Sequence, residues 1–196
     1  MLQEEYERVA ARYQELRADF AKYKFCLIAH GIAYLPDALR VYQQDYGLPI
    51  TKICIIMNPS YQAETGLDDA MMQRFKDRIE LAKAEYGCDA EILLEPSEDA
   101  LREAAQSCDF VICNGHPRYA ALDVPVLYNL FDRSVWSYQG FVDIMEEVWQ
   151  MLQQPQRTGS NLLLSKLAYD PVFYPMREAD KDSKASRELY SRVWRQ

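Results

Sequence analysis

The stretch FCLIA at residues 25–29 is a continuous apolar run, followed at once by His30 and Gly31. Strands that are apolar on both faces and alternate with helices are typical of a parallel sheet covered on both sides. The sequence therefore predicts a Rossmann-like α/β fold, a three-layer sandwich around a sheet of about five strands, and right-handed crossovers favour the strand order 3-2-1-4-5. The other short apolar runs are ICIIM at 53–57, AEILL at 90–94, FVIC at 110–113 and VPVL at 124–127.

Capping residues mark the helices between these runs. Gly47 and Gly87 stand where two helices are expected to end, because glycine readily adopts the left-handed conformation of a C-terminal cap. Thr65 and Ser97 are the expected N-caps of the next two helices, each with acidic residues nearby in the first turn. The expected helices cover residues 35–46, 66–86, a short segment after 97, and 138–153.

Residues 2–22 are expected to form an N-terminal amphipathic helix. Its apolar side chains recur at spacings of three and four and form one stripe: Leu2, Tyr6, Val9, Tyr13, Leu16 and Phe20. Two interpretations are open. The stripe packs on the core of its own domain, or it forms a helical dimer contact, although it is short for a coiled coil.

The sequence changes character after Gln154. We expect one α/β domain over residues 1–154 and a C-terminal extension over 155–196, which is too short for a core of its own. The extension begins with a linker and then carries an aromatic cluster and a highly charged end. We expect it to lie over the domain or over a partner.

Charge and cysteine content narrow the class of protein. The net charge of −8 argues against nucleic acid or anionic lipid as a partner, because phosphate binding needs clustered Lys and Arg. No apolar run approaches the roughly 20 residues of a membrane span, and the first ten residues do not resemble a signal peptide. Five cysteines, an odd number without a CxxC motif, indicate reduced thiols. We therefore expect a soluble, cytoplasmic protein.

The two histidines of the chain follow two of the expected strands. In an open parallel sheet, ligands bind outside the carboxyl ends of the strands where the strand order reverses, here between the first and fourth strands. The first strand leads into His30 and Gly31, and the fourth into Asn114, Gly115 and His116. The sequence predicts that both histidines line one crevice, in which they would act as ligands or proton-transfer groups. The alternative is that they are ordinary polar residues at strand ends.

A metal site at the histidines is not expected. Cys113 and His116, and likewise Cys26 and His30, have spacings that resemble ligand pairs. Both cysteines lie within expected strands, however, where alternate residues point to opposite faces, so buried structural cysteine is the better interpretation. The phosphate-binding, nucleophile-elbow and HExxH motifs are also absent.

Four segments together resemble the last Rossmann-like domain of the nitrogenase component 1 family. They are DFVICNGHPR at 109–118, VPVL at 124–127, FDR at 131–133 and YQGF at 138–141, and the resemblance extends over residues 1–154. This family includes the dinitrogenase subunits, cofactor-assembly scaffolds and protochlorophyllide reductase-type subunits. Membership would imply an oxidoreductase-related role, with an iron–sulfur cluster or a tetrapyrrole as cofactor.

The resemblance also implies site residues. In the dinitrogenase α-type subunit the loop after the first strand of this domain faces the cofactor, and the matching residues here are His30, Gly31, Ile32 and Ala33. The cofactor-ligating histidine of the family falls at about residues 129–131, where this chain has no histidine. The cysteines for the second cluster belong to another domain of a three-domain subunit, and this chain corresponds to one domain.

Two functions are therefore expected as alternatives. In the first, a stand-alone nitrogenase component 1-like domain binds a small-molecule ligand, metallocluster or tetrapyrrole, and if it is catalytic, His30 and His116 are the catalytic residues. Asn114 and the backbones of Gly31 and Gly115 would shape that site. In the second, the chain is a non-catalytic binding or assembly module that acts as a homodimer or in a hetero-complex.

Overall fold

The computed structural model describes residues 2–30, 35–56, 68–113, 119, 122, 124–128 and 138–153. Its centre is a parallel five-stranded sheet in the order β3-β2-β1-β4-β5, which confirms the predicted topology. The strands are β1 (Phe25–His30), β2 (Ile50–Ile56), β3 (Glu91–Leu94), β4 (Phe110–Cys113) and β5 (Val126–Tyr128). β2 begins at Ile50, three residues before the start of the expected run 53–57. β5 begins at Val126, two residues after the start of the expected run 124–127.

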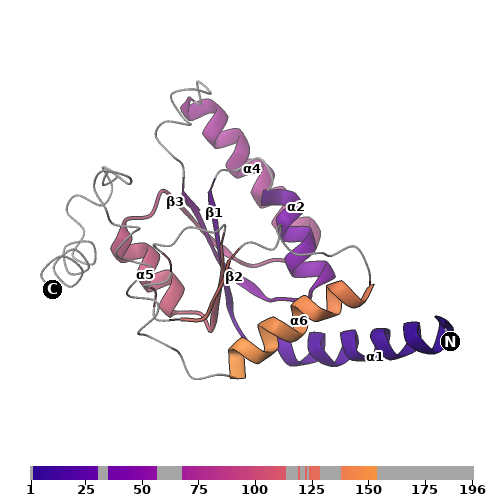
Figure 1. Cartoon of the computed structure of the whole chain (residues 1–196). Helices are drawn as coiled ribbons and strands as arrows, with labels where there is room; N and C mark the ends of the chain where they lie inside the picture. Colours follow the sequence, from indigo (N-terminus) through magenta and orange to yellow (C-terminus); the bar gives the residue numbers. More distant parts are fainter. Residues whose placement is uncertain are drawn as a thin grey trace, which may run out of the picture.

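Helices cover both faces of this sheet and make the molecule Rossmann-like (Figure 1). One face carries α1 (Leu2–Phe20), α2 (Leu35–Leu39), the π-helix η1 (Arg40–Asp45), α4 (Asp69–Tyr86) and α6 (Tyr138–Gln153). The opposite face is covered by α5 (Glu98–Gln106). Alternation along each strand divides the core: Phe25, Leu27 and Ala29 belong to the first layer, and Cys26 and Ile28 to the second.

Asp109 joins the amino ends of the neighbouring strands β1 and β4. Its carboxylate accepts a hydrogen bond from the backbone N–H of Lys24 at 2.8 Å, and its own N–H donates to the carbonyl of Lys24 at 2.9 Å. This reciprocal pair aligns Phe25 of β1 with Phe110 of β4. Asp109 therefore helps to hold the first residues of β1 and β4 in line.

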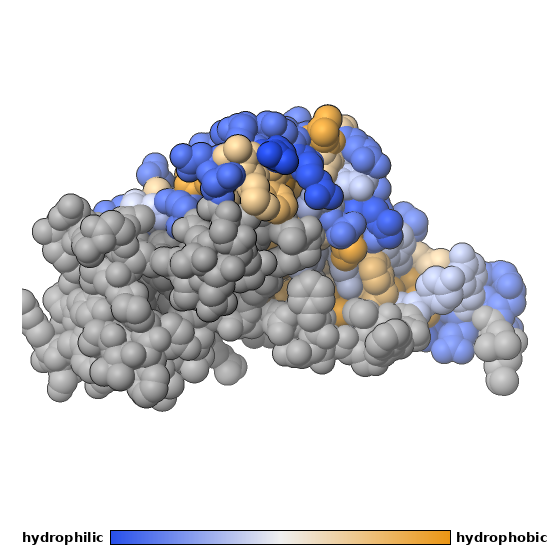
Figure 2. Space-filling model, turned by 90° about the horizontal axis from the view of Figure 1, so that it is seen from above, coloured by the Kyte–Doolittle hydropathy of each residue, from blue (hydrophilic) through white to orange (hydrophobic). Residues whose placement is uncertain are grey.

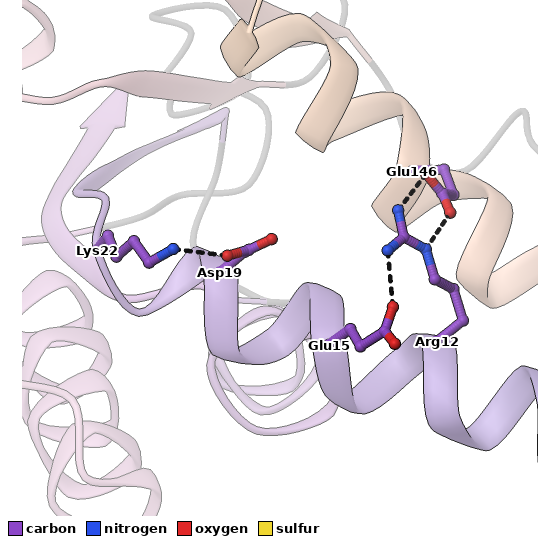
Figure 3. Close-up of polar contacts among 5 residues, drawn as sticks. All are labelled: Arg12, Glu15, Asp19, Lys22 and Glu146. Atoms are coloured by element: carbon purple, nitrogen blue, oxygen red, sulfur yellow. Dashed lines mark hydrogen bonds and ion pairs between the residues drawn. The ribbon is translucent and has the colours of Figure 1, made fainter.

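The N-terminal helix packs on its own domain. Val9, Leu16 and Phe20 are buried in the core and Tyr13 packs against it, while α1 runs beside α6 (Figure 1). Arg12 joins the two helices through a two-point contact with Glu146, and it also bonds Glu15 (Figure 3). The stripe is thus mostly covered within one chain, whereas Tyr6 near its outer end is 53% exposed.

Two helix details differ from the sequence-based expectation. Residues 35–46 were expected to be one α-helix, but its second half is the π-helix η1, in which the N–H of Tyr46 donates to the carbonyl of Val41 at 2.9 Å. The predicted N-cap Thr65 is wrong, because α4 begins at Asp69 and the side chain of Asp68 accepts the bond from the N–H of Met71. Asp68 was expected inside the first turn. The caps at Ser97 and Gly87 are confirmed.

The described part of the face seen in Figure 2 is mainly hydrophilic, with small separate hydrophobic areas. None of the helices in the described residues is long and apolar enough to cross a membrane. The extension 155–196 lies outside the described residues.

Candidate functional site

The candidate crevice belongs to the carboxyl edge of the sheet, between β1 and β4. The two strands are adjacent and parallel, and Ile28 of β1 pairs with Cys113, the last residue of β4. β1 continues to His30, which pairs with Ile56 at the end of β2. The reversal of strand order therefore falls between β1 and β4, where ligands bind in sheets of this kind.

Most of the predicted site residues lie outside the described residues. This holds for Gly31, Ile32 and Ala33 after β1, and for Asn114, Gly115 and His116 after β4. His30 is described only as the last residue of β1. That the two histidines share one crevice stays a prediction, supported by the strands that lead into them.

Two glutamates at the same edge were missed by the sequence analysis. Glu95 follows β3 with a φ of +48°, a left-handed conformation that is uncommon for a residue other than glycine. Its N–H donates to the carbonyl of Ile55 at 2.8 Å. Glu98 opens α5 and is only 1% exposed, although carboxylates are rarely buried to this degree. Such features cluster at functional sites.

The signal for these glutamates was weak in the sequence. Glu98 follows the N-cap Ser97, whose hydroxyl accepts a bond from the N–H of Ala100 at 3.2 Å. An acidic residue in that place is fully explained by the helix dipole, so nothing marked it as buried. The positive φ of Glu95 could not be predicted either, because glutamate, unlike glycine, does not favour this conformation.

The five cysteines are buried and form no disulfide, in agreement with the expectation of reduced thiols. Cys26, Cys54 and Cys113 lie on the α5 face of the sheet. Within the residues that the structure describes, no group of three or more His, Cys, Asp or Glu side chains is arranged to hold a metal ion. An iron–sulfur cluster needs thiolate or imidazole ligands, so the described residues do not provide a ligand set for one.

The strand order and the helices on both faces of the sheet define the class of protein, which is a Rossmann-like α/β domain. No family model and no curated protein sequence matches the chain.

Proposed function

We propose that the chain is a nitrogenase component 1-like domain that binds a small ligand at the carboxyl edge of its sheet, between β1 and β4. The observation that carries the proposal is the strand order, because β1 and β4 are neighbours and run into the segments that hold His30 and His116. A pair of imidazoles at such an edge suits a tetrapyrrole or another planar ligand with a metal centre, since neutral imidazole is a common metal ligand.

The buried side chain of Glu98 adds a carboxylate to the imidazoles proposed for this edge of the sheet. α5 begins four residues after the end of β3, so Glu98 lies at the carboxyl edge of the sheet, where β1 also ends. A carboxylate near an imidazole orients its ring and raises its basicity. In the proposed site Glu98 would take that role, and the histidines would contact the ligand.

Two probes test this function on the full chain. The first is titration with haemin, and the second is anaerobic reconstitution with iron and sulfide, both followed by absorbance. We expect saturable haemin binding that weakens at least about tenfold, or about 1.4 kcal/mol, in His30→Ala and in His116→Ala. Lys24→Ala, at the opposite edge of the sheet, is the matched control and should bind like the wild type. If reconstitution with iron and sulfide gives a chromophore that both histidine variants lose, the ligand is a metallocluster instead. If neither haemin nor iron and sulfide binds saturably, the proposal is contradicted.

A second candidate function is assembly, and one observation favours it. Tyr6 of α1 and Tyr138 of α6 form an edge-to-face pair with ring centroids 5.8 Å apart, and Tyr138 is 76% exposed. Exposed aromatic side chains are typical anchors of protein interfaces. In this function the pair would contact a second copy or a partner.

A further inference from the structure

Three thiols gather on the α5 face of the sheet, away from the candidate crevice. Cys26 is the second residue of β1, Cys54 lies within β2, and Cys108 lies just after α5 and two residues before β4. The sulfurs of Cys26 and Cys54 are 4.0 Å apart, and the thiols of Cys26 and Cys108 are hydrogen-bond partners. Cys26 therefore stands between the other two. We call these residues the thiol cluster.

Cys108 is the member of the cluster nearest to solvent. Its exposed fraction is 6%, whereas Cys26 and Cys54 are both at 0%, and its neighbours Ser107 and Asp109 are exposed. It lies at the amino edge of the sheet, opposite to the carboxyl edge that holds the candidate crevice. Of the three thiols, Cys108 is therefore the one that an oxidant from solvent would meet first.

The surroundings of Cys108 favour a thiolate. The hydroxyl of Thr51 lies 3.4 Å from its sulfur and can donate to a negative sulfur. The hydroxyl of Ser107 lies 3.8 Å from the sulfur and donates to the carbonyl of Ala104 at 2.7 Å. The hydrogen bond with the Cys26 thiol, helped by these hydroxyls and by the charge of Lys52, lowers the pKa of Cys108 to about 6, against the opposing effect of burial. The same partnership and burial raise the pKa of Cys26, which stays protonated. A thiolate next to a thiol is the arrangement of a reactive and a resolving cysteine.

We propose that Cys108 is a site of oxidation by hydroperoxides and that Cys26 resolves the product as a Cys26–Cys108 disulfide. In the first step the Cys108 thiolate attacks one peroxide oxygen, the O–O bond breaks, and the departing oxygen takes a proton from water. Cys108 becomes a sulfenic acid, oxidised by two electrons, and the peroxide is reduced to an alcohol or to water. In the second step the sulfur of Cys26 loses its proton and attacks the sulfur of Cys108, the S–O bond breaks, and water leaves.

The backbone favours this disulfide over the one between Cys26 and Cys54. A disulfide requires the sulfurs to approach to about 2.05 Å. Cys26 and Cys54 are held in neighbouring strands, in which Cys26 pairs with Lys52 and Ile28 with Cys54, so that their offset is fixed by the sheet. Cys108 lies between α5 and β4 and belongs to neither element, so no strand pairing of its own fixes the offset between its sulfur and that of Cys26.

The experiment treats the reduced, full-length wild-type chain with hydrogen peroxide, alkylates the remaining thiols, and maps the peptides by mass spectrometry. We expect a Cys26–Cys108 disulfide that dithiothreitol reverses, with Cys54, Cys88 and Cys113 still alkylated after denaturation. In Cys26→Ser, dimedone should trap the Cys108 sulfenic acid several-fold more than in the wild type. Cys88→Ser is the matched control, because Cys88 is buried in the other core layer, and it should leave the disulfide unchanged.

The wild-type map decides the proposal even if a serine variant folds poorly. A disulfide between Cys26 and Cys54, or oxidation of Cys108 no faster than that of Cys88, would overturn it. So would a Cys108 that remains reduced while methionines oxidise. A result of this kind leaves the proposed ligand site untouched, because the haemin titration reports on the opposite edge of the sheet.

Discussion

Single residues decide where the chain can turn and where it can react. Gly47 has a φ of +69°, and a Cβ at this position would lie 2.5 Å from Cγ of Arg17. Arg17 cannot easily move away, because its guanidinium donates to the Tyr13 hydroxyl and to the carbonyl of Gln44, both at 2.6 Å. Gly47 was predicted from the sequence as a helix terminator, but the close approach of α1 was not, because it depends on tertiary packing.

Gly47→Ala should therefore destabilise the fold more than Gly87→Ala. Gly87 has a similar φ of +63°, but a Cβ there meets no atom within 4 Å. We expect a loss of about 1 kcal/mol for Gly87→Ala from backbone strain alone, and of about 2–3 kcal/mol for Gly47→Ala, where overpacking adds to it. Urea unfolding of both variants measures the difference, and equal losses would show that Arg17 yields without cost.

The reactivity of Cys108 should follow its thiolate population. The pKa of about 6 predicts that alkylation by iodoacetamide is near its maximum at pH 7 and falls as the pH drops through 6. The groups that face this sulfur are Cys26, Thr51, Ser107 and Lys52. Lys52→Gln removes the one positive charge among them and should move the midpoint of the rate profile upward. A midpoint near the ordinary thiol value of 9.0 in the wild type would contradict this.

At the scale of the elements, the contact between α1 and α6 is partly electrostatic. Arg12 donates to both carboxylate oxygens of Glu146, one of these bonds being 3.0 Å long, and this lowers the pKa of Glu146 below its ordinary 4.5. A carboxylate whose pKa is lowered by folding stabilises the fold above its unfolded pKa, and the gain disappears as the pH falls through the folded pKa. The pair is about one-third exposed, so solvent screens it.

Glu146→Gln should lower the free energy of unfolding by about 1 kcal/mol or less at pH 7. The difference from the wild type should shrink as the pH falls below 4.5. Glu15→Gln is the matched control, because Glu15 also bonds Arg12 but lies on the same helix and is 65% exposed. Denaturant titrations at several pH values provide the test. A Glu146→Gln effect that does not vary with pH, or one equal to that of Glu15→Gln, would argue against an interhelical role.

Sequence patterns predicted most elements, and the exceptions have physical reasons. The strands were predicted from apolar runs and α6 from helical spacing, because these patterns reflect which side chains are buried. The π-helical turns of η1 were not predictable, since they depend on one shifted hydrogen bond from Tyr46 to Val41. Thr65 and Asp68 are both residue types that favour the N-cap position. Residue type alone could not show that α4 begins at Asp69 and is capped by Asp68. The buried Glu98 and the thiol cluster required the three-dimensional structure.

At the scale of the whole molecule, the N-terminal helix cannot be removed to test assembly, because it is part of the core. Removing residues 1–22 would delete the buried core residues Val9, Leu16 and Phe20, so truncation would unfold the domain rather than report on a dimer. The exposed pair Tyr6 and Tyr138 offers a milder test. If the wild type is a dimer through this surface, Tyr6→Ser combined with Tyr138→Ser should shift it to monomer in analytical ultracentrifugation without loss of stability. An unchanged sedimentation coefficient would remove this pair from any interface.

The sheet also separates two regions of the molecule with different chemistry. The carboxyl edge holds the ends of β1 and β2 and the buried Glu98, while the amino edge holds Cys108 and the hydrogen bonds between Asp109 and Lys24. In this account ligand binding belongs to the first edge and thiol oxidation to the second. The proposed ligand site depends above all on the convergence of His30 and His116.

That convergence is tested most directly by cross-linking. A His30→Cys/His116→Cys variant and a Lys24→Cys/His116→Cys control are treated with a short bismaleimide, and the linked peptides are mapped by mass spectrometry. Lys24 lies at the amino end of β1 and His30 at its carboxyl end. The account predicts a 30–116 cross-link in the first variant and no 24–116 cross-link in the control. Absence of the 30–116 cross-link, or its formation only to the extent seen in the control, would contradict the account.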